Sequence, residues 1–464
     1  MANCLCPLDG RYAEDTEILR PYFSESALFR YRLRVEVEYL LYLVNFLRVE
    51  TLSEDEFKLV RLCYHGFDDD DYRLIKFHEA KVHHDVKALE YMFVEYLKDF
   101  QLEKLCPWVH FGLTSQDINN TAVPLMLREA CKYVMFPELD KLKCCLSEIA
   151  TGCRSFPMLA LTHGQPASPT TLGKELKVFV MRLQSQLKVL MKVPFAAKFG
   201  GATGNFNAHY VAYPDVDWSD FADRFVSGLC LVRTDRTTQI EPYDRLAELC
   251  HAFCRVNTLL LDLCQDLWLY VSRGYFVLRL GALEVGSSTM PHKMNPIWFE
   301  KAEGNLGLST ALFQHMASKL PVSRLQRDLS DSTVLRNLGM PLGYALVAYR
   351  SIVQGLKRLA VNREALRKDL DDHWEVLTEA VQTVLRRERV HGAYNLLKDW
   401  VQSNRNGVTQ SSLAVFIESL DVRESVKREL LSLTPENYVG DAARLSSTSR
   451  VLSSSEPVVS SPVV

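Results

Sequence analysis

The sequence lacks the short motifs that usually mark a bound metal or nucleotide cofactor. Neither C-x-x-C nor H-E-x-x-H occurs, so a zinc site has no support. A Gly-rich dinucleotide fingerprint, a P-loop and an internal repeat of fixed period are also absent. No G-x-S-x-G elbow is present, which argues against a serine nucleophile. We therefore expect neither a metal nor a cofactor.

Charge of one sign does not dominate the chain. Its 464 residues include 54 basic and 57 acidic ones, for a formal net charge of -3, so no overall field attracts nucleic acid or an anionic membrane. Residues 1–7 have neither a basic region nor an apolar one, and no apolar run reaches membrane-spanning length. We expect a cytoplasmic protein without nucleic-acid or membrane partners, whose anionic ligands are held by local clusters.

The twelve cysteines show no regular disulfide framework. Several lie in apolar stretches such as Leu260 to Leu267, and Cys144 and Cys145 are adjacent. The pattern is that of reduced thiols in the core of an intracellular protein.

Long segments without Gly or Pro predict a mainly all-α fold. The longest clear one, Tyr243 to Arg273, has 31 residues and would span roughly 46 Å as one helix. Its apolar positions step by three and four and cover more than one narrow stripe, which predicts burial on several sides in an elongated bundle that packs against other subunits. Further helices are expected over Lys174 to Val193, and two over Leu356 to His391. Strand signals are weak, and the glycines of Phe199 to Asn207 suit a tight turn or hairpin.

Three consecutive regions are expected along the chain. They are an N-terminal helical domain (1–112), a central long-helix domain (113–356) that carries a polar loop, and a C-terminal helical domain (357–464). From about residue 446 the chain is rich in Ser and Val and has little to bury, which predicts a disordered tail.

The polar loop from Gly286 to Pro296 is the most unusual segment. Most such loops only connect helices, but this one carries adjacent serines, a lysine and two prolines. A serine can act as a base only when backbone N–H groups and a nearby cation stabilise its alkoxide, and Lys293 lies six residues after Ser287. Lys293 could equally hold a substrate carboxylate.

Two further segments offer acid and anion-binding groups. His163 stands between Thr162 and Gly164, and although a lone histidine is more often structural, an imidazole is well suited to proton delivery near neutral pH. Thr114 to Asp117 fits a helix N-cap with Asp117 at the third helical position. Such a helix start also suits a carboxylate or phosphate.

His83, His84 and Asp85 form a polar run before an apolar helix. Neighbouring helical residues point about 100° apart, so we expect one histidine rather than both to face a site.

The stretch from Arg324 to Asn337 is rich in arginine. If its part from Asp331 to Asn337 is helical, Ser332 and Arg336 share one face at i and i+4, with Arg327 close by. Two guanidiniums and a hydroxyl suit a phosphate or carboxylate, although a solvated face paired with acidic neighbours is the plain alternative.

Gly286 to Pro296 resembles the signature of the fumarase/aspartase superfamily, G-S-S-x-M-P-x-K-x-N. The other motif-bearing segments follow the order of the same motifs in the adenylosuccinate lyases of the bacterial type. The chain resembles this family from about residue 7 to about residue 445. The resemblance also rests on these motifs: Asp9-Gly10-Arg11-Tyr12, His84-Asp85-Val86-Lys87-Ala88, Thr114-Ser115-x-Asp117-Ile118-Asn119-Asn120, Thr162-His163-Gly164-Gln165-Pro166 and Asp331-Ser332-Thr333-Val334-Leu335-Arg336-Asn337.

The resemblance implies a homotetramer of three-domain subunits with a shared central bundle and active sites drawn from several subunits. It implies elimination of fumarate from adenylosuccinate and from succinylaminoimidazole carboxamide ribotide, without a cofactor. By the family match, Ser287 is the base and His163 the acid. The implied substrate-binding residues are Arg11, Tyr12, His83, His84, Asp85, Thr114, Ser115, Gln239, Lys293, Arg327, Ser332, Thr333 and Arg336.

The chain departs from the family pattern at two places. His83 stands where close relatives have Asn, and Lys301 stands where a neutral Asn contact is expected. Another fumarate-releasing lyase, such as argininosuccinate lyase or fumarase, is the alternative enzyme, because Ser287 and Lys293 are common to all of them. A non-catalytic structural protein on the same bundle is the alternative outside enzymes.

Overall fold

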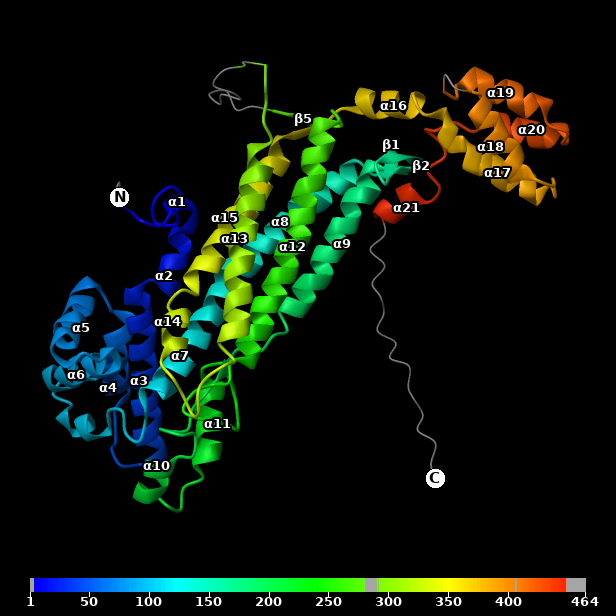
Figure 1. Ribbon diagram of the computed structural model, residues 1–464. Coiled ribbons are helices and arrows are strands. Elements are labelled where there is room, and N and C mark those ends of the chain that lie inside the picture. Colours follow the sequence, from blue (N-terminus) through cyan, green and yellow to red (C-terminus); the bar gives the residue numbers. More distant parts are fainter. Residues whose placement is uncertain (1–3, 280–289, 291, 405–406, 448–464) are drawn as a thin grey trace, which may run out of the picture. The chain divides into compact units, whose positions relative to one another are not determined.

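The computed structural model describes residues 4–279, 290, 292–404 and 407–447 (Figure 1). The chain forms two compact units. The first comprises Met1–Leu142, Leu183–Trp268 and Pro296–Gly355, and the second comprises Lys143–Arg182, Leu269–Asn295 and Leu356–Val464. The predicted three-part division along the sequence stays a prediction. None of the helices in the described ranges is both long and apolar enough to cross a bilayer.

Helix α3 (Glu25–Leu47) organises the N-terminal part of the first unit. Ser24 caps it by accepting a hydrogen bond from the Ala27 N–H, as expected of a serine at this position. Its neighbours are the helices α4 (Glu54–His65), α5 (Asp69–Val82) and α6 (Asp85–Asp99), which pack against it (Figure 1). The chain enters α3 through α1 (Ala13–Thr16), η1 (Glu17–Leu19) and α2 (Arg20–Phe23), and η2 (Glu103–Trp108) follows α6.

Two faces of α3 are buried, each in its own core. One face carries Phe29, Leu33 and Val37 at steps of four and packs on α4 to α6. The other carries Tyr31 and Val35 and packs on α7 (Ser115–Ala130) and α11 (Trp218–Gly228). A helix buried on two sides must be apolar over much of its circumference.

The long helix expected from Tyr243 is confirmed as α12 (Asp244–Ser272). In the first unit it packs with α13 (Ile297–Lys319) and α15 (Gly339–Arg358) through a buried polar contact. The Asn257 Nδ2 atom donates to Ser309 Oγ over 3.0 Å, and Tyr349 OH donates to Asn257 Oδ1 over 2.9 Å. This pairing fixes the register of three helices, because an unpaired buried amide is costly. The remaining elements of this unit are η3 (Cys131–Met135), α10 (Asn207–Ala212), α14 (Ser330–Leu335), and the strands β3 (Ala196–Ala197) and β4 (Val232–Arg233), which pair in parallel.

The second unit contains two short antiparallel pairs of strands and a helical core. Strand β1 (Pro157–Thr162) pairs with β2 (Gln165–Thr171), and β5 (Phe276–Leu278) pairs with β6 (Leu359–Val361). Its core is built from residues such as Leu377, Val381 and Leu413. The helices are α16 (Arg363–Asp371), η4 (Trp374–Leu377), α17 (Thr378–Arg387), α18 (Ala393–Ser403), α19 (Gln410–Ser419), α20 (Glu424–Leu431) and α21 (Ala442–Ser447). Helices α8 (Phe136–Gly152) and α9 (Leu172–Leu190) contain residues of both units.

The structure confirms the helical fold and corrects its details. The region from Leu356 to His391 holds the two predicted helices, α16 and α17, but also strand β6. The disordered tail expected from about residue 446 stays a prediction, because residues 448–464 lie outside the described part. Ser446 still belongs to α21, where it is buried and donates to Ala442 O. No disulfide joins any of the twelve cysteines, all of which lie in the described ranges; only half of them are buried, and Cys4, Cys144 and Cys230 are exposed.

The glycine-rich loop predicted at Phe199 to Asn207 is a tight turn rather than a hairpin, with positive φ at Gly201 and Gly204. A buried ion pair fastens it to α7. The Lys198 Nζ atom lies 2.7 Å from Asp117 Oδ1, and both side chains are fully buried. The same carboxylate accepts hydrogen bonds from the N–H groups of Gly200 and Gly201. Burial lowers the pKa of Lys198, and the attraction of Asp117 opposes that shift.

We predict that Lys198→Met destabilises the protein strongly, because it leaves the Asp117 charge buried without its partner. The free energy of unfolding should fall by about 3–5 kcal/mol, measured as a lower urea midpoint by tryptophan fluorescence. Adding Asp117→Asn should recover part of the loss. The control is Lys58→Met, which removes an exposed partner of Asp55 and should change stability by less than about 1 kcal/mol. Equal midpoints for the two lysine variants would contradict the prediction.

Candidate active site

Three of the predicted substrate contacts meet beside α14. The Arg327 guanidinium donates to Ser332 Oγ over 3.0 Å and to Gln239 Oε1 over 3.3 Å. Ser332 lies on α14, which covers Ser330–Leu335 and has Arg336 as its C-cap, so most of the segment expected to be helical is so. The Ser332 N–H donates to Asp331 Oδ1. Asp331 is held in turn by the hydroxyl of Tyr243, 2.9 Å away. The arrangement presents a planar cation and a hydroxyl together, a combination that suits phosphate oxygens.

Arg336, at the C-terminal end of α14, forms a second cationic group with Arg32 and Asp85. The Asp85 carboxylate lies 2.7 Å from Arg336 Nη2 and 2.9 Å from Arg32 Nη1. Arg32 is almost fully buried on α3, and its Nε atom donates to Asn119 Oδ1. Because two guanidiniums share one carboxylate, the trio keeps a net positive charge.

The charge of Asp85 is maintained by its two arginine neighbours. Burial alone would raise the pKa of Asp85, but Arg32 and Arg336 outweigh it and lower the pKa to about 2. Asp85 is therefore ionised at neutral pH and occupied by protein partners. In the structure it supports Arg336, and its predicted contact with a substrate stays a prediction.

The N-terminus of α7 confirms the expected helix start. Thr114 is the N-cap, and its N–H donates to Asp117 Oδ2 over 2.9 Å. The His84 Nδ1 atom accepts from the Lys87 N–H, so the neutral ring carries its proton on Nε2, which lies 3.4 Å from Ser115 Oγ. His84 and Ser115 are thus brought together at a helix end whose free N–H groups favour an anion.

The two adjacent histidines lie between two helices, directly before the apolar helix α6 as expected. His83 has a φ of +53° and is the C-cap of α5, whereas His84 is the N-cap of α6. The backbone turn separates their side chains. Of the two, only His84 is seen in contact with another candidate residue within the described chain.

The segment before α7 is held tightly. The imidazole of His110 lies 2.5 Å from the buried Glu36 carboxylate, and Tyr39 OH donates to Phe111 O over 2.6 Å. Gly112 has a φ of +69° and packs on His209, where an added Cβ would lie 2.6 Å from the ring. These contacts, made by residues outside the predicted binding set, hold the segment that leads to Thr114 and Ser115.

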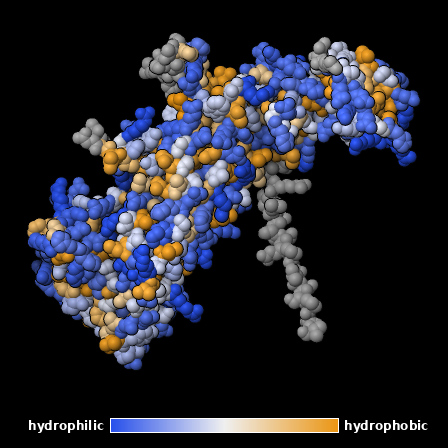
Figure 2. All heavy atoms as spheres, in the orientation of Figure 1, coloured by the Kyte–Doolittle hydropathy of each residue, from blue (hydrophilic) through white to orange (hydrophobic). Residues whose placement is uncertain are grey.

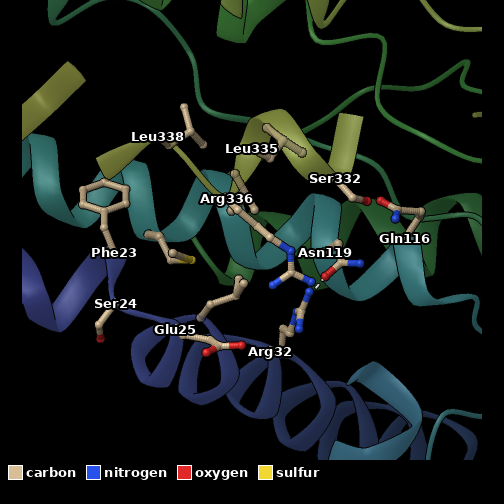
Figure 3. A pocket seen from close by; sticks show the side chains of 13 residues that line it. Phe23, Ser24, Glu25, Arg32, Gln116, Asn119, Ser332, Leu335, Arg336 and Leu338 are labelled. Atoms are coloured by element: carbon tan, nitrogen blue, oxygen red, sulfur yellow. Dashed lines mark hydrogen bonds between the residues drawn. The ribbon is translucent and has the colours of Figure 1, made fainter. Parts of the chain in front are cut away.

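A cavity of about 210 Å³ lies beside Arg336 in the same unit (Figure 3). Its polar lining includes Ser332, Arg32 and Gln116, and the guanidiniums of Arg32 and Arg336 point toward Asn119. Gln116 is only 1% exposed, and its Oε1 atom has no hydrogen-bond partner among the described residues. The apolar lining is supplied by Phe23, Leu28, Val123, Met126, Leu335 and Leu338.

Arg11 and Tyr12 precede α1 in the first unit. Arg11 is exposed, and Tyr12 is the partly buried N-cap of α1, where its N–H donates to Pro7 O over 2.8 Å. Thr333 is exposed on α14, and its carbonyl accepts from Asn337 Nδ2.

The predicted acid and the loop lysine belong to the second unit. His163 and Gly164 both have positive φ and form the two-residue turn between β1 and β2, the geometry of a primed hairpin turn. The His163 side chain is exposed at this tip. Lys293 is exposed, and its N–H donates to Met290 O over 3.0 Å. The predicted base, Ser287, lies outside the described residues.

The sequence did not reveal several residues that support the site. Arg32 and Gln116 were not predicted as site residues from any motif. Tyr243 was not predicted either, because its hydrogen bond to Asp331 joins residues 88 positions apart. Arg32 is one of three arginines in α3, beside Arg30 and Arg34, so the sequence alone does not single it out. Within the described ranges, no group of three or more His, Cys, Asp or Glu side chains is suited to hold a metal ion.

Comparison with known proteins defines the class. Residues 10–308 match the family described as lyase, and residues 323–439 match the family described as adenylosuccinate lyase C-terminal. With the helical fold, this defines a lyase of the fumarase/aspartase superfamily.

Relatives narrow this class further. The chain is 47% identical to an adenylosuccinate lyase of Dictyostelium discoideum, with 94% of this chain and 96% of the relative covered. It is 43% identical to that of Escherichia coli strain K12, with 95% and 97% covered. The chain therefore belongs to the adenylosuccinate lyase family.

Solved structures agree with the fold. A 3-carboxy-cis,cis-muconate lactonizing enzyme from Pseudomonas putida superimposes with a TM-score of 0.75 at 22% identity, over 93% of this chain and 95% of that one. A fumarate lyase from Mesorhizobium superimposes with a TM-score of 0.72 at 18% identity, over 93% and 96%. At these identities the likeness shows the fold alone.

We predict that the Asp85 carboxylate stabilises the protein above about pH 4 and loses this effect as the pH falls toward 2. Its pKa in the folded state, about 2, is below the ordinary value of 3.8, so protonation favours unfolding in this range. The contribution is about 2 kcal/mol. Urea unfolding of wild type and Asp85→Asn between pH 2 and 5 should show a gap that narrows with acid. Asp70→Asn, at an exposed pair with Arg73, is the control, and a gap independent of pH would contradict the assignment.

Proposed function

We propose that this protein eliminates fumarate from adenylosuccinate, giving AMP, and from succinylaminoimidazole carboxamide ribotide, giving the carboxamide ribotide. Both reactions belong to purine nucleotide synthesis. A nucleotide substrate is favoured over the substrates of the related lyases by one observation, the cluster of Arg327, Ser332 and Gln239 beside Arg336. Both proposed substrates carry a phosphate monoester, whereas argininosuccinate and malate have none for such a cluster to bind.

The cavity beside Arg336 agrees with a nucleotide-sized ligand. A buried acceptor left without a donor costs about 1–3 kcal/mol, and Gln116 Oε1 is such an acceptor on the cavity wall. Both substrates carry N–H groups that could satisfy it. The apolar wall suits the faces of a heterocyclic ring.

The chemistry follows from the residues assigned by the family match. Ser287 takes a proton from the succinyl carbon next to a carboxylate, and the resulting charge spreads onto that carboxylate. Lys293, Thr114 and Ser115 stabilise this growing charge. The carbon–nitrogen bond then breaks, and His163 gives a proton to the departing nitrogen. No cofactor is needed, because every step moves only protons and one electron pair.

Association into a homotetramer with shared active sites is part of the proposal. Exposed apolar side chains on α9 and α13 support it, since residues such as Val178, Met181 and Leu308 are more than a third exposed. Figure 2 shows hydrophobic residues lying at the surface among hydrophilic ones. Exposed apolar groups on long helices commonly mark subunit interfaces. The cytoplasm is the proposed compartment, and the absence of disulfides among the described cysteines agrees with it.

We predict that the purified protein cleaves adenylosuccinate, with a change in purine ultraviolet absorbance. Ser287→Ala and His163→Ala should each lower kcat by at least about 10²-fold, the scale of a lost acid or base. His65→Ala, at an exposed histidine in the last turn of α4, should leave kcat unchanged. Full activity in Ser287→Ala would exclude the mechanism.

The same assay separates the alternatives within the superfamily. If the wild type acts on argininosuccinate or malate but not on adenylosuccinate, the proposed substrate is wrong and the fold assignment is unaffected. Inactivity on all of these substrates would favour a structural protein.

We predict a particle of about four times the 53.0 kDa chain mass in sedimentation velocity, because the exposed apolar faces need partners. Replacing Met181 and Leu308 together by glutamate should shift the distribution toward smaller species, since charged groups oppose burial. A wild-type monomer at micromolar concentration would contradict the tetramer.

A further inference from the structure

Lys301 makes contacts that connect α13 to the segment from Arg11 to Asp15. Its Nζ atom lies 4.7 Å from the centroid of the Tyr12 ring, close enough for a cation–π interaction. The same atom lies 3.4 Å from Asp15 Oδ2. The side chain is 26% exposed, so solvent screens these contacts only in part.

The segment that Lys301 contacts has little stability of its own. Helix α1 has four residues, far fewer than a helix needs to be stable alone. The Arg350 Nη1 atom donates to Asp15 O over 2.6 Å, and Arg350 is itself held by Glu138. That contact fixes the backbone of α1 but not the orientation of the Tyr12 ring. Lys301 lies against the face of this ring.

We propose that Lys301 is a positioning residue that holds Tyr12, and with it Arg11, in the conformation in which these two predicted substrate-binding residues meet the nucleotide. Asp15 neutralises the ammonium group, so Lys301 acts through the geometry of this segment and not as a phosphate ligand. A short neutral amide at this position could form neither the cation–π contact nor the ion pair. The inference rests on the proposed function, because it needs a nucleotide substrate.

The first test compares Lys301→Met with Lys301→Arg in adenylosuccinate cleavage. Lys301→Met should raise KM about fivefold to tenfold, the scale of one partly exposed cation–π contact. The value of kcat should stay within about twofold, because the phosphate is remote from the bond that breaks. Lys301→Arg keeps the cation and should stay near wild type in both constants. The control Lys58→Met should change neither constant.

A double-mutant cycle tests whether Lys301 acts through the Tyr12 ring. Tyr12→Leu removes the ring, so Lys301→Met should add little further increase in KM in that background. Effects on KM that multiply in the double variant would show that the two residues act independently, and would overturn the proposal.

A binding measurement gives a readout without turnover. Titration calorimetry with AMP should show a Kd for Lys301→Met raised by about the same factor as KM. An unchanged KM and Kd in an active protein would overturn the role of Lys301 alone. A wild type that does not cleave adenylosuccinate would overturn the proposed function instead. A fall in kcat and in Tm shared by Lys301→Met and Lys301→Arg would indicate packing only, which also excludes positioning.

Discussion

The anion-binding end of α7 depends on one buried carboxylate. Asp117 accepts hydrogen bonds from the N–H groups of Thr114, Gly200 and Gly201 and pairs with Lys198. A carboxylate can be kept charged in a core only when several donors compensate its lost hydration. Here those donors come from two segments far apart in sequence, so satisfying the charge also fixes the helix start against the glycine turn. The hydroxyls that are proposed to hold the succinyl group are positioned by this requirement.

Short-range patterns in the sequence predicted this part of the site well. The capping pattern of Thr114 and Asp117 needs only three residues of spacing, and the pairing of Ser332 with Arg336 needs one helical turn. Helix α12 could be predicted equally well, because 31 residues without Gly or Pro leave few alternatives to a helix. In each case the information lies within the segment itself.

Contacts between distant segments were not predictable in the same way. The hydrogen bond from Arg32 to Asn119 joins residues that are 87 positions apart in the sequence. No pattern in either segment predicts the contact with the other. The β1–β2 hairpin was missed because its turn uses His163 at positive φ, a conformation uncommon for any residue except glycine. The first of these depends on tertiary packing, and the second depends on an unusual backbone conformation.

A nearly neutral protein can still bind a highly charged anion if its charges are unevenly placed. The formal net charge is -3, yet around α14 the guanidiniums of Arg32, Arg327 and Arg336 form ion pairs with two carboxylates, those of Asp85 and Asp331. A third carboxylate near Arg336, that of Glu25, is paired with Lys76. Asp85 and Asp331 each fix the geometry of an arginine, and the excess of cations remains for a ligand. The carboxylates therefore lower the positive charge of the site but restrict the motion of its arginine side chains. A restricted donor loses less conformational entropy when a phosphate binds. An elimination that needs no metal depends on such preorganised charges.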